Sequence, residues 1–135
     1  MPTSNPPNTS PLALLLEPDQ CWSWLQHSRT GRVIFIRDGA IEIRPVNYAA
    51  QERVISFATA SSALIAAADV NESVVFEADG HDGWTAWSVI VRGHATLTAP
   101  TPASTEIRSM FAPAKTHHIT ITPTSITGRL FDQAQ

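Results

Sequence analysis

Apolar and polar residues alternate with a period of two along most of the chain after residue 30, which predicts a mainly β protein. The strands indicated by this alternation and by the flanking turn residues are 31–37, 40–49, 53–59, 73–79, 84–97 and 117–131. Most of them follow one another through short turns, and one helix is inserted between two consecutive strands. This order indicates a closed or split antiparallel barrel with short helices rather than a parallel α/β sheet.

The first two strands form a predicted hairpin. The run Val33–Ile36 is continuously apolar, so we expect it to be buried on both faces. Asp38-Gly39 is a pair typical of two-residue hairpin turns. In the second strand Ile41 and Ile43 alternate with charged residues, and we expect these two isoleucines to face the core. Pro45 cannot donate to a ladder, which predicts an edge or a bulge at that point.

Two segments favour helices. Glu17-Pro18-Asp19 predicts a helix start, because proline needs no backbone partner there and the acidic groups suit the positive end of the helix dipole. We expect this helix to end near Ser28. The run SSALIAAADV predicts a second helix, with Ser61 or Ser62 as its N-cap and an end near Asn71.

The remaining patterns complete the domain organisation. Gly93, inside a long predicted strand, indicates a bulge or a sharp bend. Residues 1–14 are rich in Pro, Ser, Thr and Asn near their start and are expected to be a disordered tail, whereas 15–135 should form one domain. Residues 105–111 could form one further short helix. The expected fold therefore has six strands and two clear helices.

Composition and charge narrow the function. Hydrophobic residues make up 43% of the chain and charged residues only 16%, which indicates apolar surface covered by another subunit and predicts a homo-oligomer. The net charge is −3 and the arginines are scattered, which argues against nucleic acid and anionic membranes as partners. A lone cysteine, Cys21, and an N-terminus without an export signal predict a cytoplasmic protein.

Several chemistries lack a matching motif. His117 and His118 are adjacent in a strand, so their side chains point to opposite faces and cannot easily share a metal. No Walker loop, G-x-S-x-G or G-x-G-x-x-G is present, and no metal site is expected. Glu77 and Asp79 share a strand face, which we interpret as a solvated strand end. A heme held by a single axial histidine is an alternative that these patterns leave open.

The order of several short segments carries a more specific signal. These segments are GRVIFIRDG, PVNYA after the hairpin turn, FAT followed by ASS at a helix start, WSVIVRG, and a terminal ITITPTSITGR. In this order they resemble the pyridoxamine 5′-phosphate oxidase-like family of flavin-binding split barrels, over about residues 17–131. The resemblance implies a six-stranded antiparallel split barrel of the FMN-binding type, a homodimer, and an oxidoreductase that acts on an unidentified small molecule. FMN is the implied cofactor, with a deazaflavin or heme in some branches.

The resemblance also implies which residues hold the flavin. Hydroxyl groups at a helix start, here Thr59, Ser61 and Ser62, would meet the phosphate, and Ala63 stands where family members typically have lysine. The segment Pro45, Val46, Asn47 and Tyr48 would border the flavin ring, with Arg44 beside it. Trp87 and Ser88 would reach the ring bound mainly by the partner subunit. No residue is identified as the catalytic acid or base.

Each of these residues also has a purely structural interpretation. Ser61 or Ser62 could be an ordinary N-cap, Tyr48 a half-buried strand aromatic, and Arg44 an exposed strand residue. Trp84 and Trp87 could simply anchor a dimer, since tryptophan is favoured at interfaces. Two further hypotheses therefore stand beside the FMN-dependent oxidoreductase: a non-catalytic dimeric module that binds a deazaflavin, heme or no cofactor, and a structural dimer without a ligand.

Overall fold

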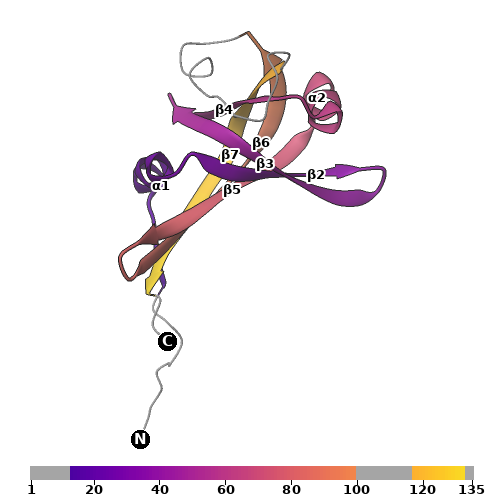
Figure 1. Cartoon of the computed structure of the whole chain (residues 1–135). Helices are drawn as coiled ribbons and strands as arrows, with labels where there is room; N and C mark the ends of the chain where they lie inside the picture. Colours follow the sequence, from indigo (N-terminus) through magenta and orange to yellow (C-terminus); the bar gives the residue numbers. More distant parts are fainter. Residues whose placement is uncertain (1–12, 100–116, 133–135) are drawn as a thin grey trace, which may run out of the picture.

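The computed structural model of the chain describes residues 13–99 and 117–132, and within them the fold is a barrel of antiparallel strands with helices at its ends (Figure 1). In chain order the elements are β1 (Ala13–Leu15), α1 (Pro18–Trp24), the 3-10 helix η1 (Leu25–His27), β2 (Thr30–Arg37), β3 (Ala40–Gln51), β4 (Val54–Thr59), α2 (Ser62–Asp69), β5 (Ser73–Asp82), β6 (Thr85–Thr98) and β7 (His117–Asp132).

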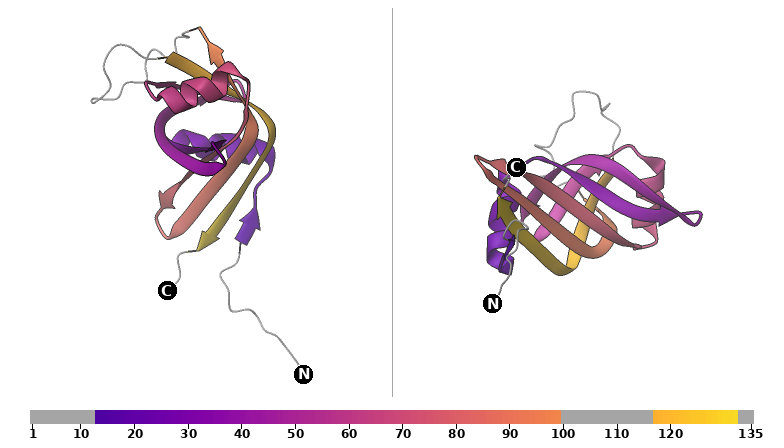
Figure 2. Two further views of the ribbon diagram at one scale, coloured as in Figure 1. Left: turned by 90° about the vertical axis from the view of Figure 1, so that its right-hand side faces the viewer. Right: turned by 90° about the horizontal axis from the view of Figure 1, so that it is seen from below.

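Six of these strands close into a ring, as the sequence predicted. The sheet order is β1-β7-β4-β3-β2-β5-β6, and β6 pairs back onto β7 to complete the barrel. Figure 2 shows the ring of strands seen from below in its right-hand view. The fold is the mainly β split barrel that the pattern indicated, with two short α-helices.

The seventh strand corrects the predicted boundary of the domain. β1 pairs with the end of β7, with Ala13 opposite Phe131 and Leu15 opposite Arg129. Residues 13 and 14 therefore belong to the sheet, and the predicted tail of residues 1–14 extended two residues too far. All three β1 residues are exposed, so this strand shows no alternation of buried and exposed positions that could have revealed it. The helix suggested at 105–111 lies outside the described residues.

The β2–β3 hairpin confirms the predicted turn but not the predicted burial. Asp38 and Gly39 both have positive φ, of 53° and 81°, as a type I′ turn requires. Ile36, Ile41 and Ile43, however, are 59%, 72% and 56% exposed. Side chains on a strand alternate between its two faces. The residues on the opposite face of this hairpin are the ones that point into the barrel and are buried: Val33, Phe35, Val46, Tyr48 and Ala50. The isoleucines therefore lie on its outer face.

Pro45 lies at an edge that no described strand covers, one of the two outcomes that its missing donor predicted. The backbone N–H of Tyr48 donates to Arg29 O at 2.9 Å, on the β2 side of β3. Because ladder bonds alternate between the two sides of a strand, the backbone groups of Pro45 and Asn47 point away from β2. On that side β4 pairs only with Tyr48–Gln51. β3 and β4 thus separate at residue 47, and Pro45 interrupts no described ladder.

The other local predictions hold as well. The register between β6 and β7 shifts between Arg92 and Gly93, and a side chain at Gly93 would collide with the backbone of Thr122. α1 begins at Pro18 with a capping box between Glu17 and Gln20. These features confirm the predicted bulge and the predicted start of the first helix.

The interior of the barrel is filled by side chains. The largest fully buried ones include Trp87, Phe57, Phe76, Ile55, Ile119 and Ile121, all under 2% exposed. Such a core leaves the outer faces and edges of the sheet as the places where a ligand can bind. None of the helices in residues 13–99 and 117–132 has the length and apolar character needed to cross a membrane.

Candidate functional site

Three of the residues assigned to the site from the sequence lie on one outer face of the sheet. Cross-strand partners share a face, and Pro45 on β3 is opposite Arg32 on β2, which is opposite Glu77 on β5. One pair further along the strands, Asn47 is opposite Thr30, and Asp79 on β5 is opposite Ser88 on β6. Pro45, Asn47 and Ser88 therefore border a polar strip that crosses four strands.

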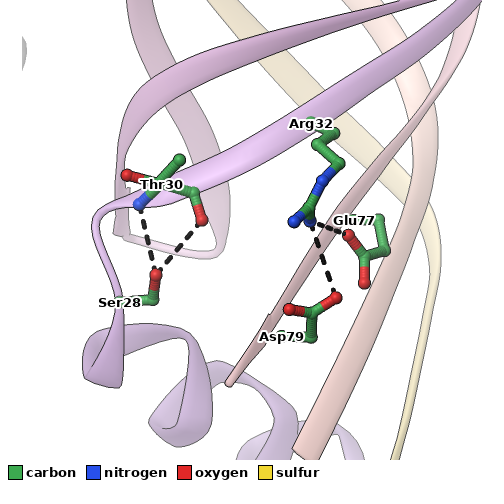
Figure 3. A network of polar contacts seen from close by, with 5 residues as sticks. All are labelled: Ser28, Thr30, Arg32, Glu77 and Asp79. Atoms are coloured by element: carbon green, nitrogen blue, oxygen red, sulfur yellow. Dashed lines mark hydrogen bonds and ion pairs between the residues drawn. The ribbon is translucent and has the colours of Figure 1, made fainter.

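An ion-pair network occupies the middle of this strip. Arg32 Nη1 donates to Glu77 Oε1 at 2.5 Å and lies 3.5 Å from Asp79 Oδ2. Figure 3 shows the guanidinium of Arg32 reaching from β2 toward both carboxylates on β5. The sequence did not reveal this network, because the pairing of β2 with β5 brings together residues some 45 positions apart.

Glu77 is the titratable group of this network with the most altered chemistry. Partial burial, followed by the hydrogen bond and the negative charge of Asp79, raises its pKa from 4.5 to about 7, although Arg32 acts in the opposite direction. Only 22% of its side chain is exposed, so the earlier interpretation of Glu77 as a solvated strand end is wrong. A carboxyl group that titrates near neutral pH can accept or donate a proton under physiological conditions.

Hydroxyl groups extend the strip beside this network. Ser28 Oγ accepts a hydrogen bond from the backbone N–H of Thr30 at 3.2 Å and donates to Thr30 O at 3.1 Å (Figure 3). Thr30 Oγ1 in turn donates to Asn47 Oδ1 at 3.5 Å. This contact fixes the acceptor end of the Asn47 side chain, so its amide NH₂ is the end that can meet a ligand.

Val46 and Tyr48, the other two members of the Pro45–Tyr48 segment, point inward. They are 7% and 4% exposed, and both belong to the core. The Tyr48 hydroxyl donates to Leu25 O at 2.7 Å, and its ring contacts Phe76 edge-on at 4.8 Å between centroids. Burial raises the pKa of Tyr48 to about 12. The Tyr48 ring is thus a structural core residue, and within the protomer its face is not available to a flavin ring.

Arg44 lies on the same side of β3 as Val46, but nearer the hairpin tip. Its Nη1 donates to Glu42 Oε1 at 2.8 Å, and its guanidinium lies 5.8 Å from the centre of the Phe35 ring. This arrangement places Arg44 on the opposite side of the strand from Pro45 and Asn47. The structure does not bring Arg44 together with the polar strip.

The three hydroxyls predicted to meet the phosphate, those of Thr59, Ser61 and Ser62, lie at the start of α2. Ser61 is the N-cap, since its Oγ accepts from Leu64 N–H at 3.3 Å, and Thr59 Oγ1 accepts from Ser61 N–H at 3.0 Å. Ser62 is exposed. Ala63 is only 5% exposed and packs in the core, so its side chain does not face a ligand at the helix start. The N-cap interpretation of Ser61 is therefore confirmed, and it leaves the hydroxyl hydrogens of Thr59 and Ser61 available to an anion.

These hydroxyls begin two residues beyond the last pair between β3 and β4. Tyr48 is opposite Phe57 in the last pair between β3 and β4, and Thr59 follows two residues later on β4. His117 is the direct cross-strand partner of Thr59 and is exposed, so its imidazole lies on the same face as the Thr59 hydroxyl.

The two tryptophans of the sequence analysis have different environments. Trp87 is 1% exposed and stacks on Trp24 at 5.8 Å between ring centroids, so it neither anchors a dimer nor reaches a flavin with its side chain. Trp84, in the β5–β6 turn, is 80% exposed. In residues 13–99 and 117–132 there is no group of three or more histidine, cysteine or acidic side chains that could hold a metal.

Comparison with known proteins places the fold in a family. The family model described as pyridoxamine 5′-phosphate oxidase matches residues 17–130. An FAD-binding protein from Mycobacterium smegmatis has a TM-score of 0.75 and 38% identity, over 88% of this chain and 98% of its own. A Corynebacterium glutamicum protein, provisionally named a pyridoxamine 5′-phosphate oxidase, has a TM-score of 0.78 and 30% identity, over 90% and 99%.

A curated relative is also similar. It is an uncharacterised protein of Mycobacterium tuberculosis that is 36% identical over 86 residues, which cover 60% of this chain and 78% of the relative. The match to the family model spans most of the chain, from the residue before α1 to Leu130 in β7. On this evidence the chain belongs to the pyridoxamine 5′-phosphate oxidase family and has its split-barrel fold.

Proposed function

We propose that this protein binds a flavin as a homodimer, with the flavin ring along the open edge of β3 and its phosphate at the start of α2. The observation that supports this most strongly is the 38% identity to an FAD-binding protein that aligns over nearly its whole length. Two features of the structure support it as well: no described strand pairs with β3 on its β4 side before Tyr48, and several hydroxyls gather at the start of α2.

The residues suit the two ends of a flavin differently. Asn47 offers an amide NH₂ and backbone groups that β4 does not pair, which fit the donors and acceptors on the pyrimidine edge of the ring. Thr59, Ser61 and Ser62 offer hydroxyls, which fit a phosphate. The basic side chain nearest to these hydroxyls in the described sheet register is His117, opposite Thr59. It would supply positive charge to a bound phosphate when protonated.

The similarity to an FAD-binding protein makes FAD the first flavin to test, and FMN, which the sequence suggested, the second. A bound flavin carries hydride and electron chemistry itself, so the protein contributes binding, orientation and electrostatics. An oxidoreductase acting on a small molecule is the activity that we propose. Glu77, on the same outer face as Asn47, would be the protein group able to exchange a proton with a ligand there.

The absorption spectrum of the purified protein, followed by titration with FAD and FMN, tests the proposal. We expect flavin bands or saturable flavin binding. Binding of a deazaflavin or heme alone would favour the non-catalytic module, and a colourless protein that ignores all four ligands would refute the proposal.

Residue variants test the placement of the flavin. Asn47→Ala and Ser62→Ala should each weaken flavin binding by about 10-fold or more, since a hydrogen bond to a charged or polar ligand group is worth about 1–3 kcal/mol. Ser125→Ala removes an exposed hydroxyl far along β7 and serves as the matched control. Unchanged affinity in both test variants would place the flavin elsewhere on the molecule.

A further inference from the structure

Two hydroxyls at the start of α2 accept hydrogen bonds and keep their own hydrogens unused. Thr59 Oγ1 accepts from the Ser61 N–H at 3.0 Å, and Ser61 Oγ accepts from the Leu64 N–H at 3.3 Å. Within residues 13–99 and 117–132 neither hydroxyl donates a hydrogen bond to another protein group. Each can therefore donate to an anion, and the oxygens of a phosphate are strong acceptors.

A phosphate at this position also calls for a positive charge, which β4 and α2 do not supply. Ala63 is 5% exposed and packs in the core, so a longer side chain there would point into the protein rather than toward a ligand. The one charged residue in these two elements is Asp69, the last residue of α2. A cation for the ligand has to come from a neighbouring element.

The start of β7 brings a basic side chain next to these hydroxyls. His117 is directly opposite Thr59 in the pair of β4 with β7. The Cβ atoms of residues that are directly opposite lie about 4.5–5.5 Å apart on one face of the sheet. α2 packs against β7 as well as β6, and its N-cap Ser61 follows Thr59 by two residues. His117 is exposed, so its imidazole is accessible to a ligand that the hydroxyls bind.

No other charged side chain of the described strands and helices faces His117. The end of β6, Thr96–Thr98, is uncharged. His118 is adjacent in the chain, but its side chain lies on the opposite face of β7. Arg29 lies beside Tyr48, on the far side of β3 from β4. In this part of the chain, the charge available to an anion at the start of α2 therefore depends on the protonation of His117.

We propose that protonated His117 selects flavins that carry phosphate, so that the affinity for FAD and FMN depends on pH whereas the affinity for riboflavin does not. This inference rests on the proposed function and specifies which side chain meets the charge of the ligand. Histidine ordinarily changes its charge between about pH 5 and 8. The affinity for a phosphate-bearing flavin should fall as the pH rises through this range.

Dissociation constants of FAD and riboflavin at about pH 6 and pH 8, measured by the change in flavin fluorescence, test this selection. The diphosphate of FAD keeps its charge over this range, so a change in affinity reports on the protein. The wild-type protein should bind FAD about five-fold more weakly at the higher pH, which is the effect of a favourable exposed ion pair. It should bind riboflavin equally at both. His117→Asn should bind FAD weakly at both pH values, and His117→Lys should bind it tightly at both.

His81→Asn is the matched control, because it removes an exposed histidine at the end of β5, and it should keep the wild-type pH dependence. Circular dichroism checks that the variants are folded. Wild-type FAD affinity that is equal at both pH values, or a pH dependence that persists in His117→Asn, would overturn the role of His117 and leave flavin binding intact. A folded wild-type protein that binds neither FAD, FMN nor riboflavin at either pH would overturn the proposed function and this inference with it.

Discussion

Glu77→Gln should stabilise the protein at alkaline pH and leave its stability nearly unchanged in acid. Glutamine keeps the shape of the neutral carboxyl group but cannot ionise. The raised pKa of Glu77, about 7 against an ordinary 4.5, means that the folded protein favours the neutral form. Desolvation therefore outweighs the attraction of Arg32, and removing the charge should help the fold wherever Glu77 would otherwise be ionised.

The sign follows from proton binding in the two states. Between pH 4.5 and about 7 the unfolded chain has released the Glu77 proton while the folded chain retains it. The stability associated with neutral Glu77 is thus fully present below the unfolded pKa and is lost as the pH rises through the folded pKa. At about 1.4 kcal/mol per pH unit the full effect is roughly 3 kcal/mol. Because the network is partly open to solvent, screening reduces the expected gain of Glu77→Gln at pH 8 to about 1 kcal/mol.

Urea unfolding at about pH 4 and pH 8, at one protein concentration, measures this difference. Asp82→Asn, which removes an exposed carboxylate at the end of β5 and outside the network, is the matched control. A contradictory result would be that Glu77→Gln lowers the free energy of unfolding at pH 8 by about 1 kcal/mol or more, as expected for a broken ion pair. The attraction between Glu77 and Arg32 would then outweigh the desolvation of Glu77.

Two further variants test the structure of the protomer. Glu52 and Arg53 form the β3–β4 turn with φ of 55° and 61°, a conformation that costs residues with a side chain about 1 kcal/mol each. The double variant Glu52→Asn, Arg53→Gly should therefore stabilise the protein by about 1 kcal/mol. It also removes the ion pair of Arg53 with Asp19, which is exposed and contributes little. Thermal unfolding checks this, and a lower melting temperature would contradict the turn geometry. Tyr48→Phe leaves the buried carbonyl of Leu25 without its donor and should cost about 1–2 kcal/mol in urea unfolding, whereas an unchanged midpoint would show that water replaces the hydroxyl.

Much of the fold could be predicted from local patterns. The Asp38-Gly39 turn, the bulge at Gly93 and the proline-led start of α1 each depend on a backbone geometry that few residues favour. The six barrel strands follow from alternation between such turns. β1 could not be predicted in the same way, because all of its residues are exposed and its pairing with β7 joins opposite ends of the chain.

The site was less predictable, because it depends on which strands become neighbours and on which face of each points outward. The isoleucines of β3 were expected inside, but Val46 and Tyr48 at alternate positions fill the core and turn Ile41 and Ile43 outward. Similarly, the ion pair between Arg32 and Glu77 needs the contact of β2 with β5, which no local pattern contains.

Calorimetric titration of the purified protein with FAD is the decisive test of flavin binding. We expect saturable binding of one FAD per chain with a Kd in the low micromolar range or below, about 8 kcal/mol of binding free energy, and weaker binding to Asn47→Ala. No detectable binding of FAD or FMN at about 100 µM to folded, ligand-free protein would contradict it.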